Sequence, residues 1–157
     1  MRGWASWIYR ALVWKERQRA SAAQDDPAAA KKSAGSHLET GRRGEQLAYW
    51  YLRQAGYRVI ARNQRLGGGS GELDLIGWDG PVLAFVEVKC RTSDVAGPPE
   101  AALKRAQQKR IIRGAHEFMR RKIKAQPNYR FDIASVFWNQ ENGFQVRLIK
   151  DAFKDRS

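Results

Sequence analysis

The segment from Gly71 to Arg91 constrains the fold more than any other part of this 157-residue chain. An alternating stretch, a turn at Asp79-Gly80-Pro81 and a nearly continuous apolar run predict a β-hairpin whose second strand is buried on both faces. Two charges, Glu87 and Lys89, interrupt the apolar run, and their spacing of two places them on one face. Burying an unpaired charge costs on the order of several kcal/mol, so these two side chains need partners or a function.

The register of this hairpin indicates what the charges face. Folding it symmetrically about Gly80-Pro81 places Asp74 opposite Glu87, and Glu72 opposite Lys89. Directly opposed side chains lie about 4.5–5.5 Å apart, so two carboxylates there require a shared proton or a cation. A divalent metal ion suits a site made only of oxygen ligands. The alternative is a solvent-facing strand with an ordinary Glu72–Lys89 ion pair.

Composition narrows the function classes. Lysine and arginine number 29 against 16 acidic residues, a net charge of +13, which indicates a polyanionic partner, either nucleic acid or an anionic membrane surface. The single cysteine, Cys90, excludes an internal disulfide and is typical of a reducing compartment, so we expect a cytoplasmic protein. With only His37 and His116, a zinc site or a Cys–His nucleophile pair is not expected.

Residues 1–37 are predicted to form a flexible N-terminal extension, followed by a domain over residues 38–152 and a tail over 153–157. A near-helical spacing indicates a short amphipathic helix that contacts a membrane surface or a partner protein through residues 1–19, and a loosely packed tail is the alternative. Its apolar residues are Trp4, Trp7, Ile8, Ala11, Leu12 and Trp14. The composition of residues 20–36 is typical of a flexible linker.

The remaining patterns predict helices at about Leu38–Gln54 and Pro98–Lys124 and strands at Tyr57–Asn63, Tyr129–Trp138 and Phe144–Ile149, besides the two hairpin strands. The resulting order, αβββαββ, predicts an α/β protein of three layers, with a mixed central sheet of about five strands and helices on both faces.

The second of these helices carries a dense basic surface that only Glu100 and Glu117 offset. Such a surface is typical of contact with a phosphate backbone, whereas a solvated helix face is the alternative. The predicted nucleic-acid-binding residues are Arg65, Arg91, Lys104, Lys109, Arg110 and Arg113.

The hairpin residues suit phosphodiester hydrolysis, which needs a metal ion and a cation that stabilises the growing negative charge. Asp74 and Glu87 are the predicted metal ligands, joined by the backbone carbonyl of Val88, and Lys89 is the predicted catalytic cation. Glu72 is an accessory candidate. Magnesium usually takes one or two protein carboxylates, so this ligand set is sufficient. Glu45, taken from its helix alone, fits a solvated first-turn glutamate better than a site residue.

Asp74, followed after twelve residues by Glu87-Val88-Lys89, matches the D…(D/E)-X-K signature of the PD-(D/E)XK nuclease superfamily. The surrounding sequence resembles the YraN-type family, a widespread bacterial family of unassigned cellular role that is similar to archaeal Holliday-junction resolvases. The resemblance spans roughly residues 41–150. Its motifs are Gly41-x-x-Gly44-Glu45, Gly71-Glu72-Leu73-Asp74-Leu75-Ile76, Phe85-Val86-Glu87-Val88-Lys89-x-Arg91 and Arg130-Phe131-Asp132.

The resemblance implies a restriction-endonuclease-like fold and an active site of Glu45, Asp74, Glu87 and Lys89. Glu45 is expected to complete the Mg²⁺ or Mn²⁺ shell, either directly or through a water molecule. It further implies an endonuclease acting on DNA, with branched or flapped structures as substrates, and a homodimer, because resolvases of this fold cut two strands symmetrically. Two other readings remain open. One is a nucleic-acid-binding protein without turnover, and the other is an adaptor that works through its tryptophan-rich N-terminus.

Overall fold

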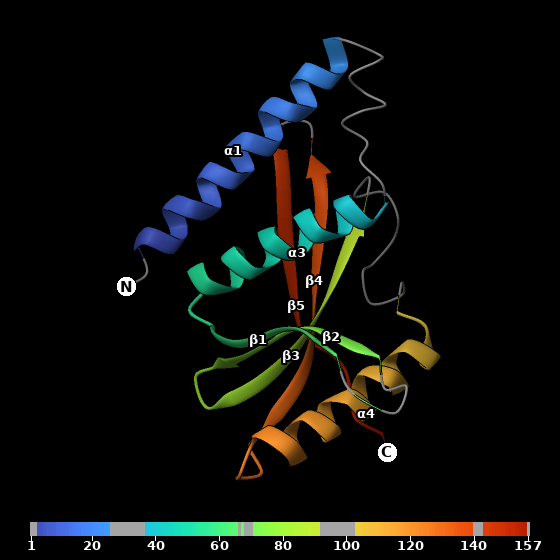
Figure 1. The fold of residues 1–157 in the computed structure, drawn as a ribbon. Coiled ribbons are helices and arrows are strands. Elements are labelled where there is room, and N and C mark those ends of the chain that lie inside the picture. The colour runs from blue at the N-terminus through green and yellow to red at the C-terminus, as the bar shows by residue number, and fades with distance from the viewer. Residues whose placement is uncertain are drawn as a thin grey trace.

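The computed structural model describes residues 3–25, 37–65, 67, 71–91, 103–139 and 143–156 (Figure 1). Its elements, in chain order, are α1 (Gly3–Asp25), α3 (His37–Gln54), β1 (Arg58–Arg65), β2 (Glu72–Asp79), β3 (Val82–Arg91), α4 (Arg105–Lys122), β4 (Tyr129–Asn139) and β5 (Gly143–Phe153). From α3 onward this order reproduces the predicted αβββαββ.

One mixed sheet of five strands, in the order β1-β2-β3-β4-β5, forms the middle layer. The β3–β4 pair is parallel and the other three pairs are antiparallel. Helix α4 lies in the crossover between the two parallel strands, and it covers one face of the sheet while α3 and α1 lie over the other (Figure 1). The predicted α/β class, mixed sheet and three layers are confirmed.

The core has two halves, one on each face of the sheet, because β3 is buried on both sides. Leu83 and Phe85 pack towards α4, where Phe118 and Phe131 surround the Phe85 ring at 6.2 and 5.8 Å. Val86 and its neighbours instead pack against α3. The α3-facing cluster includes Leu47, Ala48, Leu52, Leu75, Ala84, Val86 and Val136. This two-sided burial is what the apolar run in the sequence predicted.

The predicted hairpin register is confirmed. The pairs run from Asp79 with Val82 to Leu75 with Val86, and Gly80 closes the turn at a φ of +59°, a conformation that favours glycine. The strict alternation of faces that the sequence indicated for the first hairpin strand, with Leu73 and Leu75 on one side, is wrong at the open end of the hairpin. Leu73 packs in the α4-facing core rather than beside Leu75, so the alternation of faces breaks around Asp74.

Helix α1 is longer than the predicted short helix, since it continues to Asp25 through part of the stretch whose composition indicated a linker. It packs on α3, where Trp4 meets Trp50 at 5.4 Å and Tyr9 meets Tyr51 at 5.8 Å between ring centroids. Residues 26–36 lie outside the described part of the chain, and the division at residue 37 stays a prediction. None of the helices in the described residues is long and apolar enough to span a membrane.

Two boundaries differ from those expected. Helix α4 begins at Arg105 rather than near Pro98, because Lys104 has an extended backbone (φ −59°, ψ 146°); residues 92–102 are not described. Strand β5 continues past Ile149, with a register shift opposite Phe131–Ile133. Asp151 adopts a φ of 56° there, and its N–H donates a 2.8 Å hydrogen bond to Asp132 Oδ1. The Asp132 carboxylate therefore holds a bulge that lets the strand resume.

Candidate active site

Asp74 and Glu87 lie at the end of the β2–β3 hairpin, one step beyond the last paired residues, Leu75 and Val86. Here a side chain takes the place of a backbone acceptor between the strands, because Asp74 Oδ2 accepts a 2.7 Å hydrogen bond from the backbone N–H of Val88. Glu87 is only 8% exposed although it is a charged residue. The pair is thus fixed by the backbone of two adjacent strands.

Glu87 has two hydrogen-bond donors, both directed at Oε1. Lys89 Nζ approaches it to 2.9 Å from the same strand, and Gln107 Nε2 approaches it to 2.7 Å from the first turn of α4. The alternative pairing of Glu72 with Lys89 is not what forms, because Glu72 instead pairs with Arg65 at 3.5 Å. Lys89 therefore accompanies the buried carboxylate, and Glu72 lies apart in an exposed ion pair.

Glu45 projects from α3 towards the same region. Its Oε2 accepts a 2.9 Å hydrogen bond from Asn63 Nδ2 on β1, and its charge contributes to raising the pKa of Asp74. Asn63 itself has a φ of 46°, a left-handed conformation that asparagine tolerates better than most residues. Glu45 is therefore partly buried and oriented towards the sheet, whereas its position on the helix alone suggested a solvated side chain.

The electrostatics of Asp74 reflect this crowding. Burial, followed by the charge of Glu87, raises the pKa of Asp74 from 3.8 to about 7, while the Val88 N–H and Lys89 act in the opposite direction. Two neighbouring carboxylates either share a proton, so that one of them stays neutral, or need a cation between them when both ionise. A carboxyl group perturbed by burial and by a specific charged neighbour is typical of a functional site.

The donor set fits a hard cation that keeps part of its water shell. Within the described residues, no group of three or more histidine, cysteine or acidic side chains is arranged to hold a metal ion. Asp74 Oδ1 and Glu87 Oε2, however, have no hydrogen-bond donor among those residues. Two carboxylates with one open oxygen each suit Mg²⁺ or Mn²⁺, which retain several waters and use one or two carboxylates.

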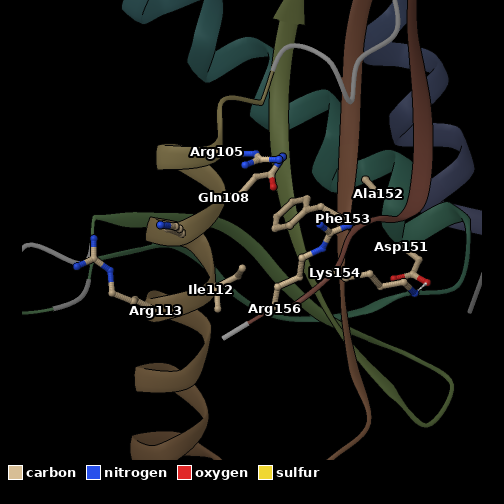
Figure 2. Close-up of a pocket in the computed structure, with 10 residues that line it drawn as sticks. Arg105, Gln108, Ile112, Arg113, Asp151, Ala152, Phe153, Lys154 and Arg156 are labelled. Carbon is tan, nitrogen blue, oxygen red and sulfur yellow. Dashed lines mark hydrogen bonds and ion pairs between the residues drawn. The ribbon is translucent and has the colours of Figure 1, made fainter.

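A basic cavity of about 840 Å³ lies between α4 and the end of β5 (Figure 2). Five of its ten lining residues are basic, and its one acid, Asp151, pairs with Lys154. The first turn of α4 links the two sites, because Gln107 binds Glu87 while Gln108 lines the cavity. The basic lining residues are Arg105, Lys109, Arg113, Lys154 and Arg156.

The predicted nucleic-acid-binding residues do not all gather there. Lys109 and Arg113 line the cavity, whereas Arg110 on α4 and Lys104 just before it are exposed outside its lining. Arg65 lies apart with Glu72. Arg91 ends β3, and its side chain lies outside the described part of the structure.

Sequence reasoning missed the residues that contact the site from other elements of the fold. Gln107 and Asn63 each bind one carboxylate of the cluster. The tail residues Lys154 and Arg156 complete the basic cavity. The only sequence signal for Gln107 was an amide placed within a strongly basic run, which does not by itself identify a partner.

The fold and the site together define an α/β protein with a carboxylate–lysine cluster at the open end of its central hairpin. The chain belongs to the uncharacterised protein family UPF0102, whose model matches residues 44–136. The predicted resemblance to the YraN-type family is thereby confirmed.

Several UPF0102 proteins of bacteria are similar over most of their length. The protein of Koribacter versatilis is 41% identical over 117 residues, which cover 74% of this chain and 80% of the relative. That of Syntrophus aciditrophicus is 42% identical over 118 residues, or 75% and 91% of the two chains. That of Solibacter usitatus is 49% identical over 96 residues, or 61% and 73%.

Proposed function

We propose that this protein is a metal-dependent endonuclease that hydrolyses phosphodiester bonds in DNA, with branched or flapped structures as its substrates. The observation that supports this most is the pairing of Asp74 with the buried Glu87 beside Lys89, where burial and mutual repulsion raise the pKa of Asp74 to about 7. A structural ion pair would not need a second carboxylate at this point of the sheet. We expect the protein to act in the cytoplasm, and we propose a homodimer for cuts in two strands.

The residues of the chain have separate roles in this proposal. Asp74 and Glu87 would hold Mg²⁺ or Mn²⁺, together with the Val88 carbonyl and with Glu45 through water. The bound ion supplies Lewis-acid activation of the phosphate and of the attacking water. Lys89 directs its ammonium group at the negative charge that develops on the phosphate. Asn63 and Gln107 act as positioning residues, because each binds a carboxylate of the cluster.

The basic cavity supports a nucleic-acid substrate. Its five cations lie on α4 and after β5, so a phosphate backbone seated there would run past the helix turn that contacts Glu87. Contacts of this kind position a duplex without reading its sequence. A substrate recognised by backbone and shape rather than by bases is consistent with branched DNA.

The test is cleavage of labelled single-stranded, duplex, flapped and four-way-junction DNA in Mg²⁺ and in Mn²⁺. Glu87→Gln and Lys89→Ala should remove metal-dependent product while DNA binding and the circular dichroism spectrum are retained. Glu16→Gln is the matched control, because Glu16 is also 8% exposed but lies on α1 and pairs with Arg43. Unchanged cleavage by Glu87→Gln would overturn the assignment.

A nucleic-acid-binding protein without turnover is the second candidate. The observation that favours it is that Lys89 and Gln107 already satisfy Glu87 Oε1, as they would in a purely structural cluster. This candidate predicts DNA binding that weakens steeply with salt and no metal-dependent product from any of the four substrates.

A further inference from the structure

Helix α1 has two faces of different character, and only one of them is used by the fold. Its inner face packs on α3 and the sheet through Ala5, which is 2% exposed, and through Tyr9, Leu12 and Val13. Its outer face carries Trp7 and Trp14, which are 72% and 63% exposed. Exposed apolar surface that is rimmed by polar residues often marks an interaction site.

The outer face is also uniformly cationic. Between Gly3 and Gln18, the exposed charged residues are Arg10, Lys15 and Arg17, and none is acidic. The one acid in this stretch, Glu16, is turned inward and pairs with Arg43 of α3 at 3.8 Å. Arg10 lines one cavity together with Trp7 and Trp14.

Tryptophan beside arginine, without acids, matches the chemistry of a lipid headgroup layer. Indole rings favour the boundary between headgroups and acyl chains, and lysine or arginine near an anionic surface adds attraction that depends on salt. A helix that lies flat on the bilayer needs only such a face. This face belongs to a helix outside the segment that matches the family model, residues 44–136, so the proposed nuclease chemistry does not account for it.

We propose that the outer face of α1 binds the surface of membranes that contain anionic phospholipids. Trp7 and Trp14 insert at the headgroup level, and Arg10, Lys15 and Arg17 contact lipid phosphates. The helix lies on the surface and does not cross it, so the rest of the protein stays docked through α3. The inference does not depend on whether the protein cleaves DNA.

The test is co-sedimentation of the full chain with vesicles of phosphatidylcholine alone and of phosphatidylcholine mixed with phosphatidylglycerol. We expect binding to the mixed vesicles, and a loss of affinity of about tenfold or more in the Trp7→Ser/Trp14→Ser double variant. Ile60→Ser is the matched control for lost apolar exposure, because Ile60 is 40% exposed on β1. Arg10→Gln should also weaken binding to the mixed vesicles. Its matched control is Arg58→Gln, which removes one positive charge from an exposed position on β1 and should leave binding unchanged.

A second measurement keeps the proposal testable if the double variant folds poorly. Brominated lipids in the mixed vesicles should quench the tryptophan fluorescence of the wild-type chain. They should quench little in Trp7→Phe/Trp14→Phe, which keeps Trp4, Trp50, Trp78 and Trp138 as reporters.

Four results would overturn the proposal. Equal vesicle binding by the wild type and the Trp7→Ser/Trp14→Ser variant would assign lipid binding to another basic face. Equal binding to vesicles with and without phosphatidylglycerol would show that the cations have no role. Self-association that the variant abolishes, with no vesicle binding, would assign the face to a second copy of the chain. Binding of single-stranded DNA that the variant abolishes, again without vesicle binding, would assign it to base stacking.

Discussion

Asp74 and Asp132 show how two carboxylates in one sheet differ in what they do for the fold. Asp132 is fully buried, and Arg130 Nε, Tyr57 Oη and the Asp151 N–H all donate to it at 2.8–3.1 Å. Asp74 has one short backbone donor and a repelling neighbour. The first carboxylate holds β4 and β5 together, whereas burial and the charge of Glu87 raise the pKa of the second.

We predict that Asp74→Asn stabilises the metal-free protein. The folded-state pKa of about 7 lies above the unfolded value of 3.8, so the metal-free fold loses stability as the pH rises through this interval. Removing the charge should therefore add on the order of 2 kcal/mol to the free energy of unfolding at about pH 8. Urea denaturation with chelator measures it. Mg²⁺ should then stabilise the wild type and not the variant.

We predict that Asp132→Asn, the same chemical change as Asp74→Asn, has the opposite effect on stability. Removing its charge leaves the Arg130 guanidinium without one of its carboxylate partners, so the free energy of unfolding should fall by about 3 kcal/mol. If both variants moved stability in the same direction, the distinction between a structural and a functional carboxylate would be wrong.

Gly44 and Cys90 fix how closely α3 approaches β3. A Cβ on Gly44 would lie 2.0 Å from Cys90 Sγ, whereas its other nearest neighbours, Cys90 Cβ and Val136 Cβ, stay at 3.6 Å or more. We predict that Gly44→Ala is destabilising in the wild type but neutral or stabilising in Cys90→Ala, where the helix gains about 1 kcal/mol from alanine. The coupling in this double-mutant cycle should be about 1–2 kcal/mol, measured by urea denaturation. Additive effects would refute the contact.

At the scale of elements, the hairpin was the most predictable part and α1 the least. The apolar run and the Gly80-Pro81 turn determined the β2–β3 register, because a slip of one residue would reverse every buried side chain. In α1 the spacing predicted an amphipathic helix but not which of its faces packs on the fold. Trp7 and Trp14 face outward, while the buried contacts come from Ala5 and from Tyr9 against Tyr51, which cannot be read without the position of α3.

The candidate site was predictable where its residues belong to the β2–β3 hairpin. Asp74, Glu87 and Lys89 belong to one local hairpin, so their proximity follows from strand pairing. Gln107 and Asn63 meet them through tertiary packing that no local pattern encodes.

We predict that α1 is part of the stable fold through its inner face only. Tyr9→Ala should lower the free energy of unfolding by about 2 kcal/mol, since Tyr9 packs edge-on against Tyr51 and contacts the α3-facing core. Trp7→Ser should change it by less than about 0.5 kcal/mol, because exposed side chains contribute little. Thermal unfolding followed by circular dichroism gives both values. A large loss in Trp7→Ser would contradict the assignment of faces.

At the scale of the whole molecule, the basic residues behind the net charge of +13 have different roles. Some cations serve the fold, such as Arg130 and Lys150, which both bind Asp79. The cations of the basic cavity have one internal acid among them, Asp151. One group of cations with little internal acid to offset it therefore lies where α4 meets the end of β5.

We predict that DNA affinity depends on salt through the basic cavity. The logarithm of the binding constant should fall linearly with the logarithm of the salt concentration, and Lys109→Gln/Arg113→Gln should reduce the slope by about 2. Arg17→Gln, an exposed charge on α1, should leave the slope unchanged. Fluorescence anisotropy of a labelled duplex measures all three. Equal slopes in every protein would mean that DNA binds elsewhere.

The parallel pairing of β3 with β4 has a consequence for the order of folding. Strands β2 and β3 meet across a two-residue turn, so Asp74 and Glu87 can come together through contacts that are close in sequence. Strand β4 pairs with β3 only after the long crossover that contains α4 and Gln107 has closed, which is intrinsically slower. We therefore expect the carboxylate pair to form early and to receive its partner from α4 late, because the hairpin needs only contacts that are close in sequence.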